Sequence, residues 1–150
     1  MSYNVKRGFP VVVPVLAYED VGAALEWLGR VFGFAETLRY SDGGGVIRWA
    51  EMRYGRGYLM LTEPADLSFA DQQPAGGGPR ARTVVFTDDV DAHRRRTMAE
   101  GGLPVTEAAE KPEGLREYDA LDPGGHVWTF SQHLADVAPA AWGAVGCSDL

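Results

Sequence analysis

Apolar and polar residues follow a pattern along this chain that recurs after 69 positions. An apolar, β-branched run at residues 11–18 precedes a helical stretch that begins after Asp20. A second run, at residues 82–87, precedes a helical stretch that begins after Asp89. Runs of this kind are typical of strands, and a short polar acceptor before a helical pattern is an N-cap signal. The sequence therefore predicts that one structural unit is present twice.

Both helical stretches end close to a glycine. In the first stretch, apolar residues recur every three or four positions as far as Phe32, which is the spacing of an amphipathic helix. Gly33 and Gly102 lie 69 positions apart, like the two aspartates, so we expect both glycines to end their helices with left-handed or otherwise glycine-requiring backbone. Extended segments are expected at residues 36–40, 46–54 and 58–63 in the first half, and near Pro104, at 115–121 and at 126–132 in the second.

The order strand, helix and then three extended segments, used twice, predicts an α+β fold. We expect two βαβββ modules whose curled mixed sheets close around a cleft, because two copies are too few for a solenoid. The triple glycine at residues 76–78 lies in a polar stretch without periodicity, which is typical of a linker. The expected boundaries within this single domain are about 10–63 for module one, 64–80 for the linker, 81–133 for module two and 134–150 for a tail.

Composition narrows the range of partners. The 150 residues carry a net charge of −7, whereas binding to nucleic acid or to an anionic membrane requires clustered Lys and Arg. No apolar run approaches the roughly 20 residues that span a bilayer. The single cysteine, Cys147, cannot form an intramolecular disulfide, which fits a reducing compartment. We therefore expect a cytoplasmic protein that binds a small molecule, with no nucleic acid or membrane partner.

Two segments carry a resemblance to a known family. The first is Trp27-Leu28-Gly29-Arg30-Val31-Phe32-Gly33-Phe34, and the second is Asp122-Pro123-Gly124-Gly125-His126, the turn before the last strand. Together with the duplication, they resemble the vicinal-oxygen-chelate superfamily of glyoxalases, bleomycin-resistance proteins and extradiol dioxygenases over residues 10–133. The resemblance implies the paired-module fold and a homodimer, with modules paired within one chain or across two.

The resemblance also implies where a metal ion would bind. In metal-dependent members, the first and last strands of each module supply His or Glu ligands to one divalent ion. Counting from the matched motifs places these positions at Val13, Leu61, Arg82 and Thr129. Such a site needs three or four nitrogen or oxygen donors, which these side chains do not provide. We therefore expect no metal and no other cofactor, and we assign no catalytic residue.

Aromatic residues on the expected strands favour a flat apolar ligand. Rings that line a cleft hold such a ligand by stacking and burial, and the guanidinium of Arg82 can orient a carbonyl or an anion. The favoured function is a metal-independent protein that sequesters an aromatic or bulky ligand such as an antibiotic. The alternative is a metal-dependent glyoxalase-like lyase or an extradiol-type dioxygenase. The expected ligand-binding residues are Val13, Trp49, Leu61, Arg82, Val84, Phe86, Tyr118 and Thr129.

Overall fold

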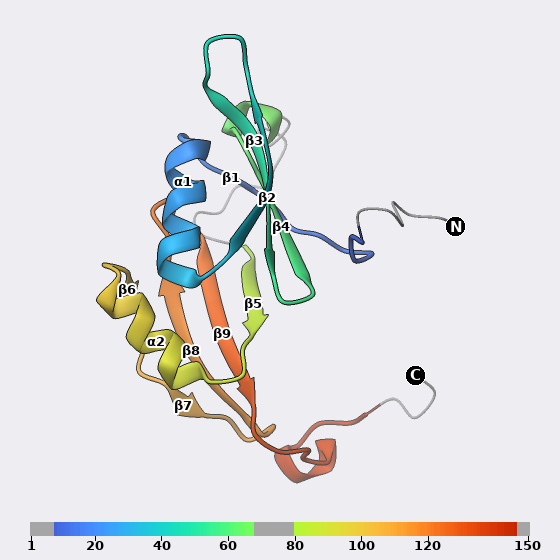
Figure 1. Cartoon of the computed structure of the whole chain (residues 1–150). Helices are drawn as coiled ribbons and strands as arrows, with labels where there is room; N and C mark the ends of the chain where they lie inside the picture. Colours follow the sequence, from blue (N-terminus) through green and yellow to red (C-terminus); the bar gives the residue numbers. More distant parts are fainter. Residues whose placement is uncertain (1–7, 68–79, 147–150) are drawn as a thin grey trace. The chain divides into compact units, whose positions relative to one another are not determined.

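The structure, a computed structural model, describes residues 8–67 and 80–146 and is a mixed α+β fold with two sheets. Figure 1 shows the elements in chain order. The chain divides into two compact units, and the turn Asp122–His126 belongs to the first unit although it joins two strands of the second. Unit 1 is Met1–Ala81 with Asp122–His126, and unit 2 is Arg82–Leu121 with Val127–Leu150.

Unit 1 contains a four-stranded sheet and the continuous helical segment formed by α1 and η1. Its strand order is β1-β4-β3-β2, in which β1 is parallel to β4 and the other neighbours are antiparallel. The elements are β1 (Val15–Ala17), α1 (Val21–Trp27), the π-helix η1 (Leu28–Phe32), β2 (Ala35–Ser41), β3 (Ile47–Tyr54) and β4 (Gly57–Thr62). The expected strand at residues 11–18 is therefore shorter than predicted, since only its last part pairs with β4.

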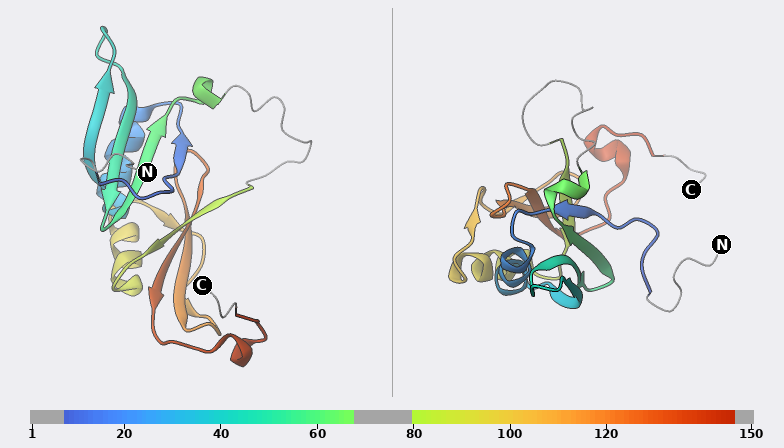
Figure 2. Two further views of the ribbon diagram at one scale, coloured as in Figure 1. Left: turned by 90° about the vertical axis from the view of Figure 1, so that its right-hand side faces the viewer. Right: turned by 90° about the horizontal axis from the view of Figure 1, so that it is seen from above.

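Unit 2 repeats this order around a second sheet, with the helix lying along one face (Figure 2). The main strand order is β5-β9-β8-β6, with β5 parallel to β9, and β7 also pairs with β8. The elements are β5 (Arg82–Phe86), α2 (Val90–Ala99), β6 (Leu103–Pro104), β7 (Ala109–Glu110), β8 (Leu115–Leu121), β9 (Val127–His133) and the 3₁₀-helix η3 (Pro139–Trp142). The predicted linker lies mostly outside the described residues, as does Cys147.

Both helices begin as the sequence predicts. The Asp20 carboxylate accepts a hydrogen bond from the Ala23 amide at 2.9 Å, and the Asp89 carboxylate accepts one from the Ala92 amide at 3.0 Å. Both aspartates have extended backbone, the usual conformation of an N-cap. The two residues therefore occupy equivalent positions, and the 69-residue repeat is structural at this point.

The helix ends differ by one residue. Gly33 is left-handed with φ 85°, as expected, but the left-handed glycine after α2 is Gly101 with φ 88°, so the prediction for Gly102 is wrong. The physical reason lies in η1. A π-helical turn accommodates one more residue than an α-helical turn, which makes the first helical segment one residue longer between its N-cap and its terminal glycine.

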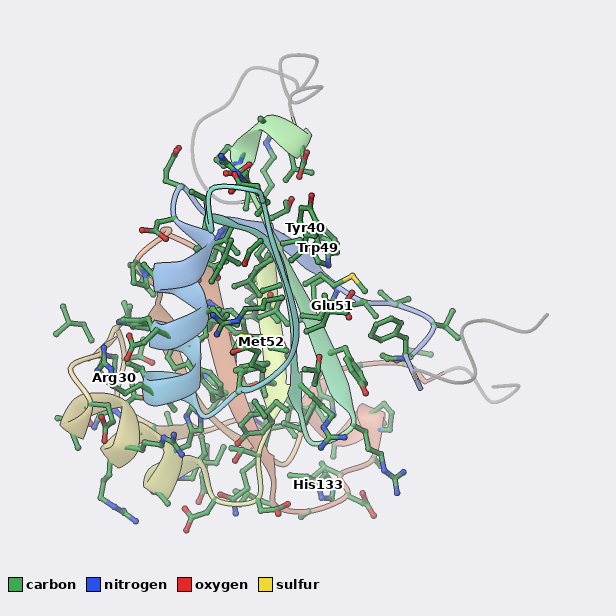
Figure 3. All side chains as sticks on the ribbon, turned by 45° about the horizontal axis from the view of Figure 1, so that its top comes forward. Arg30, Tyr40, Trp49, Glu51, Met52 and His133 are labelled. Atoms are coloured by element: carbon green, nitrogen blue, oxygen red, sulfur yellow. The ribbon has the colours of Figure 1, made fainter. Side chains whose placement is uncertain are left out.

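Each unit buries apolar side chains between its helix and its sheet. In unit 1, Met52 of β3 lies against Gly29, on the side of the sheet where α1 and η1 pack. Its neighbours on this face of β3 and β4 are Ala50, Leu59 and Leu61, and all four side chains are buried. Side chains alternate between the faces of a strand, so Trp49 and Glu51 lie on the other face. Figure 3 shows Met52 toward α1 and the side chains of Trp49 and Tyr40 together, away from α1.

Candidate ligand-binding face

The orientation of the unit 2 sheet follows from its contacts with α2. The His93 ring of α2 stacks on Phe130 of β9 with ring centroids 4.0 Å apart. The Tyr118 hydroxyl of β8 lies 2.7 Å from His93 Nδ1 and 2.8 Å from Thr97 Oγ1, both on α2. Trp128, two residues before Phe130, is fully buried on the same side. These rings therefore form the core beneath α2.

The opposite side of this sheet is called here the distal face. Thr129 of β9 donates a hydrogen bond of 2.6 Å to the Asp119 carboxylate of β8, so these two side chains share a face that alternates with Tyr118 and Phe130. Residues paired across neighbouring strands, and those two positions along each strand, complete the set. The distal face comprises Arg82, Val84 and Phe86 of β5, Val127, Thr129 and Ser131 of β9, and Glu117, Asp119 and Leu121 of β8.

Apolar side chains on the distal face are exposed. Phe86 is 60% exposed, Leu121 44% and Val84 43%. Large apolar side chains that gather on one exposed face are a common feature of binding surfaces. Four of the predicted ligand-binding residues lie on this face, namely Arg82, Val84, Phe86 and Thr129.

Tyr118 does not lie on the distal face. It is 1% exposed and its hydroxyl is held by α2, so its placement contradicts the expectation that it contacts a ligand. The same arrangement applies to Trp128, which lies beneath α2 and can respond to a ligand on the distal face only indirectly. Thr129 and Trp128 are adjacent on β9, so their side chains lie on opposite faces of the sheet: Thr129 on the distal face and Trp128 beneath α2.

Polar groups line the middle of the distal face. The Ser131 side chain is fully buried, and its hydroxyl has no hydrogen-bond partner in the described structure. Ser131 lies in register between Phe86 on β5 and Glu117 on β8. Buried polar atoms usually have a hydrogen-bond partner, so the unsatisfied hydroxyl of Ser131 is an unusual feature of the distal face.

In unit 1, the predicted residues are divided between the two faces of the sheet. Leu61 is fully buried on the side of α1. Val13 precedes β1 and is half-buried. Trp49 lies on the side away from α1, opposite Tyr40 in the β2–β3 register. Its indole N–H lies 3.2 Å from the carboxylate of Glu51, to which it donates, and Glu51 is only 4% exposed.

The turn Asp122–His126 is held to the end of β1 by buried hydrogen bonds. The Tyr18 hydroxyl donates to Asp122 Oδ2 at 2.5 Å, while Asp122 Oδ1 accepts from the Gly124 and His126 amides at 2.9 and 3.0 Å. His126 Nε2 lies 2.8 Å from the Ala17 carbonyl oxygen. Burial, then the charge of Asp122 and then this hydrogen bond raise the pKa of Tyr18 far above its ordinary value. His126 therefore has the turn-stabilising position of a structural residue.

The positions that the resemblance assigns to a metal do not suit a divalent cation. Leu61 is aliphatic and faces α1, Val13 is aliphatic, and Arg82 is a fixed cation. Thr129 offers one hydroxyl, whose proton is donated to Asp119. Across residues 8–67 and 80–146, no group of three or more His, Cys, Asp or Glu is arranged to hold a metal ion. No chemical step is therefore derived through a metal at these positions.

Three polar residues of the distal face were not among the predicted ligand-binding residues. Ser131 could have been predicted from the sequence, because it follows Thr129 by two positions and must share its face. Glu117 and Asp119 carry a similar signal, since they alternate with Tyr118 and Ala120 along β8. That alternation of polar and apolar residues indicates which side of β8 faces the core.

Comparison with known proteins identifies the family. The family model described as Glyoxalase/Bleomycin resistance protein/Dioxygenase superfamily matches residues 10–130. The chain therefore belongs to this superfamily. It is also 27% identical over 140 residues to an uncharacterized protein of Mycobacterium tuberculosis, a match that covers 91% of this chain and 81% of the relative.

Solved structures give the same result. TioX from Micromonospora sp. ML1 is 38% identical, with a TM-score of 0.67, over 82% of this chain and 98% of TioX. A glyoxalase/bleomycin resistance protein/dioxygenase from Nocardioides is 21% identical (TM-score 0.62), over 91% of this chain and 90% of that protein. Lactoylglutathione lyase from Agrobacterium tumefaciens is 20% identical (TM-score 0.61), over 82% and 92%. The last two support the fold alone.

Among the described residues, no helix is both long and apolar enough to cross a membrane.

Proposed function

We propose that this member of the Glyoxalase/Bleomycin resistance protein/Dioxygenase superfamily is a metal-independent binding protein for a flat, aromatic small molecule, of the drug-sequestering kind that the family name includes. The observation that carries the proposal is the distal face of unit 2, where Phe86 and Val84 are exposed side by side on β5 and Leu121 is exposed at the diagonally opposite corner. A planar ring system laid along β5 would cover Phe86 and Val84 and stack on Phe86.

The residues around the exposed apolar groups support binding more than catalysis. The hydroxyl of Thr129 is engaged by Asp119, and the guanidinium of Arg82 lies at one end of the face, where it can contact a polar substituent. Apolar surface with a few polar groups is typical of the lining of a small-molecule site. Binding of this kind needs no bond to be formed or broken.

The test uses three fluorescent probes that share one three-ring frame. These are acridine, which is neutral at pH 7, 9-aminoacridine, which is cationic, and acridine-9-carboxylate, which is anionic. Each probe is titrated with the protein and its fluorescence anisotropy is followed. We expect at least one of the three to bind with a Kd below the millimolar range.

The matched variants are Phe86→Ala and Met98→Ala. Both side chains are exposed, so neither substitution should unfold the protein, but Met98 lies on α2 and away from the distal face. Loss of the stacking ring should weaken probe binding about two- to tenfold, as expected for 0.5–1.5 kcal/mol of ring contact. Met98→Ala should leave binding unchanged. If no probe binds, or if the two variants behave alike, the proposed function is wrong.

A further inference from the structure

Two carboxylates lie on the distal face, on β8, and β9 separates them from Phe86 on β5. Glu117 and Asp119 are both half-buried on β8 and are separated by one residue, so they point to the same side. Neither carboxylate forms an ion pair with a basic side chain of the described residues. The neighbouring Arg116 points to the other face of the sheet, where it is paired with Asp91. Among the described residues, these two carboxylates therefore have no ion-pair partner.

The buried hydroxyl of Ser131 lies next to these carboxylates. Ser131 is the partner of Glu117 in the β8–β9 register, and such pairs have Cβ atoms about 4.5–5.5 Å apart. Its hydroxyl has no partner in the described structure, although it can both donate and accept. A hydroxyl of this kind can accept a hydrogen bond from a bound N–H group. The hydroxyl is thus an independent sign of an unfilled polar position at this place.

We propose that Glu117, Asp119 and Ser131 form a subsite for a cationic nitrogen, such as a protonated amine or amidine, attached to the flat ring system of the ligand. This proposal rests on the proposed function, since it assumes that the ring lies on the distal face. A protonated amine has several N–H donors and no acceptor, which suits two carboxylates and one hydroxyl. Hydrogen bonds between charged partners are about twice as strong as neutral ones, so this subsite selects ligands by charge.

The charge of the whole protein requires a control. The net charge of −7 attracts any cation weakly, wherever it binds. Glu110 of β7 provides the matched residue, because it pairs with Arg116 across the strands and therefore lies on the face opposite Glu117. Glu110→Gln and Glu117→Gln remove the same charge from the same sheet, one on each side.

The experiment measures the Kd of 9-aminoacridine and acridine for the full chain and its variants. We expect the cationic probe to bind more tightly than acridine, and Glu117→Gln to weaken only the cationic probe, by about tenfold for one lost charged hydrogen bond. Ser131→Ala should also weaken the cationic probe, with no loss of thermal stability, because it removes an unsatisfied buried hydroxyl. Glu110→Gln should change neither probe.

The outcomes separate this inference from the proposed function. If acridine and 9-aminoacridine bind equally well, or if Glu117→Gln and Glu110→Gln have the same effect, the cationic subsite is wrong while the aromatic binding face stands. If neither probe binds, the proposed function itself fails. Circular dichroism of each variant confirms that the fold is intact before its Kd is compared.

Discussion

Replacing Tyr18 by Phe tests the hydrogen bonds that fasten the Asp122–His126 turn to unit 1. The substitution removes the hydroxyl that donates to Asp122 Oδ2 at 2.5 Å but keeps the ring. That ring packs closely on the turn, since a Cβ on Gly124 would come within 2.9 Å of Tyr18 Cδ1. Both partners of the lost bond are buried, so water replaces it poorly. The expected cost is therefore the charged hydrogen bond alone.

The magnitude follows from the charge of the acceptor. A hydrogen bond to a charged group contributes about 1.5–3 kcal/mol, and Asp122 keeps its two amide donors, so we expect the free energy of unfolding to fall by about 2 kcal/mol. For a protein of this size, that corresponds to a decrease in Tm of about 4–8 °C. Urea denaturation followed by circular dichroism measures the change. The control is Tyr40→Phe, which removes the same atom from a side chain that is 59% exposed and should have little effect.

The pH dependence gives a second, independent readout. The pKa of Tyr18 is raised in the folded protein, so above about pH 10 the unfolded chain binds fewer protons than the folded one. The stability that the hydroxyl contributes is therefore complete below pH 10 and decreases above it, by about 1.4 kcal/mol per pH unit. The gap between wild type and Tyr18→Phe should narrow over this range. A gap of zero at pH 7, or one that stays constant to pH 11, would refute the reasoning.

Three further predictions concern the rest of the molecule. Tyr118→Phe loses the contacts to His93 and Thr97 and should lower the free energy of unfolding by about 1–3 kcal/mol without changing the binding of an acridine probe, as measured by denaturation and anisotropy. Gly114→Ala places a Cβ 2.1 Å from the Ala135 carbonyl oxygen at a φ of 86°, so denaturation should show a loss of more than about 2 kcal/mol. Elemental analysis of purified protein should find no stoichiometric Zn, Ni, Mn or Fe; one equivalent that a chelator removes together with enzymatic activity would contradict the proposed function.

Local signals were enough to predict most of the fold. The N-cap aspartates, the order of strands and the bounds of β8 at residues 115–121 all follow from periodicity and turn residues, which act over a few neighbouring positions. The left-handed glycine after α2 did not follow, because Gly101 and Gly102 are adjacent and chemically alike. The 69-residue offset pointed to Gly102 because the first half contains a π-helical turn that the second lacks, and no residue type marks that turn.

The site was harder to predict because strand phase decides which side chains face a ligand. In β4, apolar residues occupy both faces of the strand from Tyr58 to Leu61, so the sequence contains no contrast that reveals the phase. The sequence therefore does not show that Leu61 faces α1. In β8 the contrast exists, and giving Glu117 and Asp119 the same weight as Tyr118 would have placed all three correctly.

The positions of the charges on the distal face also decide between two kinds of ligand. Arg82 lies four residues before Phe86 on β5, which is about 13 Å along the strand, and β5 is two strand spacings, about 10 Å, from β8. Its backbone is thus roughly 16 Å from that of Glu117, so the two residues lie at diagonally opposite corners of the face. An anion held by Arg82 and a cation held by Glu117 would occupy opposite ends of the face. Because Phe86 lies in register with Ser131 and Glu117, a ring that is stacked on Phe86 and extends across β9 brings its substituents to Glu117.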